Sequence, residues 1–130
     1  MPSSATEWVE AYRVAWETKD PEAAARLFTP DATYRDNIVE PAHEGQDGVR
    51  AYWTSVTASQ DDVQVRMGRP FVDGDRVTAE FWTNMKVGGQ EVTLAGCLLL
   101  DFTQDWQCRR LREYWHFLEG RHEPPEEWGQ

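Results

Sequence analysis

The sequence contains no long hydrophobic run, although hydrophobic residues make up 40% of its 130 positions. A membrane-spanning helix needs about 20 consecutive apolar residues, so none is expected. The first residues, MPSSATEWVE, also lack the basic and apolar segments of a signal peptide. We therefore expect a soluble cytoplasmic protein, and this length is typical of a single domain.

Basic residues are scarce. The chain has 13 Lys and Arg against 23 Asp and Glu, which gives a formal net charge of -10. So acidic a surface repels phosphate backbones unless basic side chains gather in one patch. The only dense basic cluster, Arg109, Arg110 and Arg112, falls on both faces of a predicted strand. We therefore expect no nucleic-acid partner.

Cysteine is also scarce, with only Cys97 and Cys108. The predicted strands place them on neighbouring strands but roughly 13 Å apart along the strand direction, which excludes a disulfide. Neither cysteine has a histidine at metal-site spacing, and no pair of histidines has such a spacing either. No glycine-rich loop precedes a helix in the manner of a nucleotide site. We expect no metal and no cofactor.

Three segments have the apolar spacing of amphipathic helices. Ser4 and Glu7 form a capping box at the start of the first. Asp20 and Pro21 are an N-cap and a first-position proline for the second, and Pro30 ends it. The predicted helices are residues 4–18, residues 20–29 and a segment that starts near residue 45.

Beyond residue 63 the apolar period changes from helical to two, which is typical of half-buried strands. A short strand within residues 31–37 precedes the third helix, and four antiparallel strands follow it. The strand over about residues 90–102 is apolar on both faces, so both should be covered. The four strands are separated by turns at Asp73-Gly74 and Gly88-Gly89 and by a loop over residues 103–107.

This order of elements predicts an α+β domain over residues 1–119, with the helices on one face of a curved sheet, and a polar tail over residues 120–130. Pairing across the turns assigns alternate residues to the concave face beneath the helices. The other face is too apolar for open water. We therefore expect a homodimer through this outer face, which carries Trp82, Cys97, Leu99 and His116.

The segment DATYRDN, residues 31–37, places Asp36 on the same side of its strand as Tyr34. If that side faces the core, a carboxylate is buried there at a cost in free energy, which indicates a functional role. A structural role remains the alternative, in which Asp36 caps the following loop or pairs with a nearby arginine.

Three segments carry a family resemblance: AYRVAWETKDPEAAARLFTPDATYRDN, EGQDGVRAYW and CLLLDFTQDWQCRRLREYW. Together they resemble the nuclear transport factor 2-like superfamily, especially its SnoaL-like branch, which is related to ketosteroid isomerase and polyketide cyclases. The resemblance covers about residues 6–118. It implies a cone-shaped α+β fold, in which a strongly curved mixed or antiparallel sheet wraps three N-terminal helices around an internal pocket.

The same resemblance implies site residues. DATYRDN is similar to the ketosteroid isomerase segment whose aspartate, at Asp36, is the general base, and Tyr12 matches the oxyanion-hole tyrosine. Leu98 stands where that isomerase has a second aspartate, but the predicted register places Glu113 beside Leu98. An acidic residue on the last strand is similar to SnoaL-type cyclases. The predicted lining of the pocket is Trp16, Tyr34, Trp53, Phe81, Met85, Leu98 and Trp115.

We therefore predict a cofactor-independent acid/base enzyme of isomerase, cyclase or dehydratase type. Asp36, Glu113 and Tyr12 are its candidate catalytic residues, and its substrate is a small hydrophobic molecule that is cyclic or carries a carbonyl. Two alternatives stay open. The protein binds a hydrophobic ligand without turnover, or it is a dimerisation domain whose pocket is filled by its own side chains. Within the site, Glu113 could instead form a salt bridge and Tyr12 could be a packed core residue.

Overall fold

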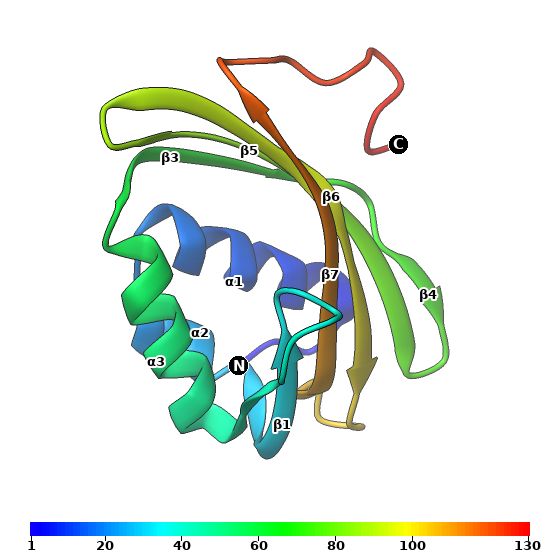
Figure 1. The fold of residues 1–130 in the computed structure, drawn as a ribbon. Coiled ribbons are helices and arrows are strands. Elements are labelled where there is room, and N and C mark those ends of the chain that lie inside the picture. The colour runs from blue at the N-terminus through cyan, green and yellow to red at the C-terminus, as the bar shows by residue number, and fades with distance from the viewer.

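The computed structural model describes all 130 residues and contains three helices beside one large sheet (Figure 1). The Ser4 side chain accepts a hydrogen bond from the Glu7 backbone N–H, and Asp20 accepts one from Ala23, so two helices begin where the capping residues predict. The helices are α1 (Ala5–Glu17), α2 (Pro21–Ala25) and α3 (Gly45–Thr57).

Seven strands form the sheet in the order β2-β1-β7-β6-β5-β3, with β4 pairing to β5. All pairs are antiparallel except β1 with β7, which are parallel. The sheet curves over the helices, which all lie on its concave side (Figure 1). The predicted α+β cone is confirmed. The strands are β1 (Phe28–Arg35), β2 (His43–Glu44), β3 (Gln60–Met67), β4 (Phe71–Asp73), β5 (Arg76–Val87), β6 (Gln90–Phe102) and β7 (Cys108–Glu119).

The predicted strand register is confirmed except at Cys108, which was expected opposite Asp101. Phe81 pairs with Gly96 across the β5–β6 turn, and Leu98 pairs with Glu113 across the loop before β7. Cys97 and Cys108 both carry free thiols. The last pair before that loop is shifted by one residue, so that Cys108 faces Phe102 rather than Asp101.

Several predicted boundaries are wrong. The second helix ends at Ala25, and β1 begins at Phe28, before Pro30 rather than after it. Pro30 fits in β1 because the β1–β7 ladder shifts register between Phe28 and Thr33, where a residue without an N–H is tolerated. The short strands β2 and β4 were not predicted, because segments of two or three residues carry no periodicity.

Aromatic rings fill most of the space between the helices and the sheet. Trp8 stacks on Tyr12, with ring centroids 5.4 Å apart, and meets Phe28 and Phe102 edge-on. The Trp8 indole N–H donates to the Leu27 carbonyl over 3.0 Å, so this fully buried ring leaves no polar group unpaired. Three of the seven tryptophans, Trp8, Trp16 and Trp53, belong to this core.

The C-terminal tail, residues 120–130, returns along the outer side of the sheet (Figure 1). The Trp82 indole N–H donates to the His122 carbonyl over 2.9 Å, and Arg69 N–H donates to the Gly129 carbonyl over 2.9 Å. Trp128 packs edge-on against Trp82. The tail thus covers part of the outer face, and the homodimer expected there stays a prediction. None of the helices is long and apolar enough to cross a membrane.

Gly96 lies in β6 opposite Trp115 of β7, where there is no room for a Cβ atom. A Cβ atom built on Gly96 would overlap the Tyr114 carbonyl oxygen and lie 2.8 Å from the Trp115 Cα. Both neighbours are backbone atoms of the paired strand, so they cannot move aside without distorting the sheet.

We therefore expect Gly96→Ala to lower the free energy of unfolding by about 1–3 kcal/mol, as for overpacked sites, in urea denaturation. Gly74→Ala is the control. Gly74 has a φ of +62° but nothing within 4 Å of an added Cβ, so only the left-handed backbone cost of about 1–2 kcal/mol applies. A Gly96→Ala protein as stable as the wild type would contradict this account of the strand contact.

Candidate functional site

Glu113 is a carboxyl group buried beneath the helices. It projects from β7 on the concave side of the sheet and is only 8% exposed. The Tyr34 hydroxyl donates to Glu113 Oε2 over 2.6 Å, and the Tyr12 hydroxyl lies 3.1 Å from the Tyr34 hydroxyl. No basic side chain pairs with Glu113, so the salt-bridge alternative does not hold. The three residues form one hydrogen-bonded row from α1 through β1 to β7.

Burial dominates the protonation of this row. It raises the pKa of Glu113 to about 8, against a lowering effect of the Tyr34 hydrogen bond, and the nearby Asp36 charge raises it further. Burial and the Glu113 charge also raise the pKa values of Tyr12 and Tyr34 well above the ordinary tyrosine value. At neutral pH Glu113 is therefore mostly an un-ionised acid, and both tyrosines keep their protons.

Asp36 lies at the rim of the cone rather than in its core. The residue follows the last residue of β1, and its side chain is 28% exposed. Its Oδ1 lies 2.8 Å from His43 Nε2, and the His43 ring stacks on Tyr52 with centroids 4.4 Å apart. Asp36 lies on the same side as Tyr34, since both contact His43, but it is only partly buried because the chain bends after Arg35. The partner of Asp36 is a histidine, not an arginine.

A cavity of about 50 Å³ remains between α1, α3 and the sheet. It is far smaller than the roughly 300–1,000 Å³ of typical ligand pockets, because the aromatic rings fill the cone. At about 10–15 Å³ of probe volume for each water, it has room for a few water molecules or one compact ligand. Its lining residues are Tyr12, Trp16, Tyr34, Tyr52, Trp53, Val56, Thr57, Gln60, Leu94 and Glu113.

Half of the ten predicted site residues line this cavity, namely Tyr12, Trp16, Tyr34, Trp53 and Glu113. Asp36 and four of the predicted lining residues do not. Phe81, Met85 and Leu98 are buried in the packed core. Trp115 is 42% exposed at the rim, where its indole N–H donates to the Asp36 carbonyl over 2.7 Å. Five lining residues were missed: Tyr52 and Val56, on the predicted apolar face of the third helix, together with Thr57, Gln60 and Leu94.

Trp53 brings an unpaired donor to the cavity wall. It is 3% exposed, and its indole Nε1 has no hydrogen-bond partner. By contrast, Trp16 Nε1 donates to Gln60 Oε1 over 2.9 Å. A buried N–H without a partner costs about 1–3 kcal/mol, which an acceptor atom placed in the cavity could recover. No group of three or more His, Cys, Asp or Glu side chains is placed to hold a metal ion.

A comparison with protein families identifies the family to which this fold belongs. The profile of the SnoaL-like domain matches residues 9–110. The chain belongs to the SnoaL-like family. No protein of curated function matches it. The family match ends before Glu113, so the acidic residue on β7 lies just outside the matched segment.

Solved structures of the same fold agree with this SnoaL-like assignment. A hypothetical protein from Catenulispora acidiphila with a ketosteroid isomerase-like fold, solved with trimethylamine, is 23% identical; the alignment covers 85% of this chain and 86% of that one, with a TM-score of 0.76. The epoxide hydrolase/cyclase-like enzyme SalBIII, linked to pyran ring formation in salinomycin, is 20% identical over 88% and 95% of the two chains, with a TM-score of 0.77.

A third structure, assigned as a SnoaL-like polyketide cyclase from Shewanella denitrificans, is 12% identical over 85% and 89% of the two chains, with a TM-score of 0.73. At such identities the likeness shows a shared fold. The activities of these proteins do not pass to this chain on that basis.

The buried Glu113 predicts an unusual pH dependence of stability. Its pKa is about 8 in the folded protein and near the ordinary value of 4.5 in the unfolded chain. Between these values the folded state holds more protons, so stability falls as pH rises from 4.5 to 8 and the loss is complete above 8. At about 1.4 kcal/mol per pKa unit, the loss amounts to several kcal/mol.

Urea denaturation across this pH range checks the prediction. Glu113→Gln should remove the fall, since its side chain cannot ionise. Glu119→Gln, an exposed glutamate on the same strand, should keep the wild-type pH dependence. Equal slopes in the wild type and in Glu113→Gln would show that Glu113 is not a buried neutral acid.

Proposed function

We propose that this protein is a cofactor-independent acid/base enzyme of the isomerase, cyclase or dehydratase type. Its substrate is a small hydrophobic molecule that is cyclic or bears a carbonyl group. The observation that carries the proposal is the buried, un-ionised Glu113 in hydrogen-bond contact with Tyr34 at the wall of an apolar cavity. A carboxyl group in such a place is costly for stability, and functional sites are where such costs are commonly retained.

In this proposal the two carboxyl groups have opposite roles. Glu113, protonated at neutral pH, donates a proton or hydrogen bond to oxygen as negative charge develops there. Asp36, partly exposed and bonded to His43, accepts the proton from carbon and becomes neutral, while the negative charge develops on the substrate oxygen. Tyr12 acts through Tyr34 rather than on the substrate, because its hydroxyl is bonded to that of Tyr34.

The cavity supports a compact substrate. Its volume of about 50 Å³ suits a short or singly cyclic molecule with its larger part held at the rim by Tyr52 and Trp115. A carbonyl oxygen is the acceptor that would pair with Trp53 Nε1. The ring-forming role of SalBIII and the cyclase assignment of the Shewanella protein are in line with this chemistry.

One observation favours the second candidate, a protein that binds or dimerises without turnover. The cone is nearly filled by its own side chains, as the dimerisation reading predicts. The two candidates differ in what the loss of a carboxylate does. An enzyme that loses Asp36 still binds its ligand but loses rate, whereas a binder changes only its affinity.

Exchange of α-hydrogens tests the proposal without knowledge of the natural substrate. Small ketones such as acetone, cyclopentanone and cyclohexenone are incubated with the protein in D2O, and the loss of α-protons is followed by NMR. We expect wild-type protein to accelerate exchange for at least one ketone. Asp36→Asn should slow it by about 10²–10⁴-fold, the usual contribution of a general base.

Asp105→Asn, in the exposed loop before β7, is the matched control and should keep the wild-type rate. A wild-type rate equal to that of buffer for every ketone, together with ligand-induced shifts of the Trp53 indole resonance, would reject the enzyme in favour of the binder.

The pH profile of exchange should report Glu113 directly. Because only its protonated form donates, the rate should fall as pH rises through about 8. Glu113→Gln keeps a neutral hydrogen-bonding group and should lose this fall while retaining part of the rate. An unchanged profile in Glu113→Gln would remove Glu113 from the mechanism.

A further inference from the structure

The outer face of the sheet has a groove of about 740 Å³ that is much larger than the interior cavity. Its floor consists of the small residues Ala95, Gly96 and Cys97 in the middle strand, β6. The strands on either side carry larger groups, since Trp82 and His116 flank Ala95, and Glu80 and Tyr114 flank Cys97. A row of small residues between two rows of large ones forms the hollow.

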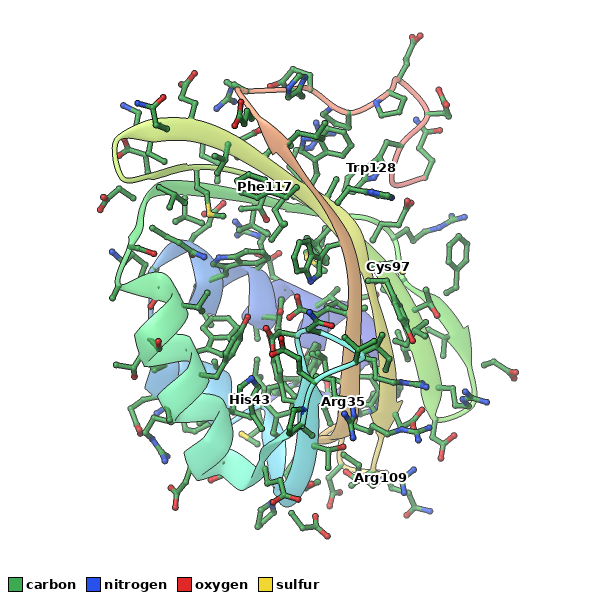
Figure 2. The ribbon with its side chains drawn as sticks, in the orientation of Figure 1. Arg35, His43, Cys97, Arg109, Phe117 and Trp128 are labelled. Carbon is green, nitrogen blue, oxygen red and sulfur yellow. The ribbon has the colours of Figure 1, made fainter.

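The C-terminal tail completes one wall. Trp128 packs edge-on against Trp82 at a centroid distance of 6.0 Å, and both rings line the groove. Figure 2 shows Trp128 on the outer side of the sheet, beyond Cys97. The Trp82 indole N–H is hydrogen-bonded to the His122 carbonyl of the tail. The contact between the tail and the sheet therefore fixes the positions of both indoles.

The charge of the groove is of one sign. No lysine or arginine lines it, while Glu80 and Asp36 do, and Glu113 lies at its inner end. Glu80 forms no ion pair, although its charge is felt by the neighbouring thiol and contributes to the raised pKa of Cys97, after the larger effect of burial. An unpaired carboxylate among aromatic rings is favourable for a cation whose hydration is weak.

One cation already uses this aromatic wall. The guanidinium of Arg66, which is not among the groove's lining residues, lies 5.5 Å from the centre of the Trp128 ring. Tyr114 carries no such partner and is 40% exposed. Its ring therefore remains available for a cation that enters the groove.

We propose that this outer groove binds a small organic ammonium ion, such as a quaternary or methylated amine. Its methyl groups contact the faces of Trp82 and Tyr114, and Glu80 balances its charge. A strongly hydrated metal ion is a poor fit, because the groove offers rings and one free carboxylate rather than several oxygen ligands. The proposal does not depend on the acid/base chemistry proposed for the interior. It is an alternative to the homodimer predicted for this face, because a second copy over Trp82, Cys97 and His116 would cover the groove.

A pair of isosteric probes tests the proposal. Choline and its neutral carbon analogue, 3,3-dimethylbutan-1-ol, have the same shape and differ in charge. Binding is followed by the indole N–H resonances of the seven tryptophans at constant ionic strength, which holds the effect of the net negative charge fixed. We expect choline to shift the Trp82 and Trp128 resonances and to bind at least roughly 10-fold more tightly than the alcohol.

Two variants locate the site. Glu80→Gln and Tyr114→Leu should each weaken choline binding by roughly 3- to 30-fold, the range expected for loss of one cation–π contact or one nearby charge. Glu91→Gln, an exposed glutamate at the far end of β6, is the matched control and should bind like the wild type.

Equal affinity for the two probes would overturn the proposal, as would binding that ignores both variants. Shifts confined to Trp53 and Trp16 would also overturn it, because they would place the ligand in the interior cavity instead.

Discussion

The hydrogen bond between the Tyr34 hydroxyl and Glu113 connects the parts of this molecule that matter most for its chemistry. Tyr34 comes from β1 and Glu113 from β7, which are the only parallel pair in the sheet, and Tyr12 extends the row to α1. A buried carboxyl group needs a partner, and here the partner is neutral rather than basic. The Glu113 carboxyl group therefore stays protonated. The contact between the helices and the sheet at this point contains a neutral acid instead of an ion pair.

This arrangement explains why the cone can be so full of aromatic rings. A neutral acid and two protonated tyrosines place little charge in the core, so the surrounding tryptophans pack against them as they would against other apolar groups. Only Trp53 Nε1 is left without a partner at the cavity wall. The same aromatic packing leaves a small cavity and an indole N–H without an acceptor.

Much of the fold could be predicted from the sequence. Caps at Ser4 and Asp20 predicted two helix starts, and the Gly88-Gly89 turn predicted the β5–β6 register. Across the residue 103–107 loop, period-two alternation placed Leu98 near Leu111 or Glu113, and the structure pairs it with Glu113. The position of Asp36 could not be predicted in this way. Its environment depends on a bend after β1 and on His43, which arrives through a two-residue strand too short to have a pattern. The size of the cavity was equally out of reach, since it depends on how large rings from separate elements interlock.

The parallel pairing of β1 with β7 has a consequence for how the chain reaches its folded state. Tyr34 and Glu113 are 79 residues apart in sequence, and β7 is the last strand of the chain. Contacts between such distant segments are slow to form, because the entropy of closing a long loop is lost before the contact contributes. During synthesis, β1 and the helices above it therefore cannot form their contacts with β7 until almost the whole polypeptide has been made. A ribosome stalled anywhere before β7 would hold an exposed edge and an open aromatic core, the kind of surface that chaperones bind.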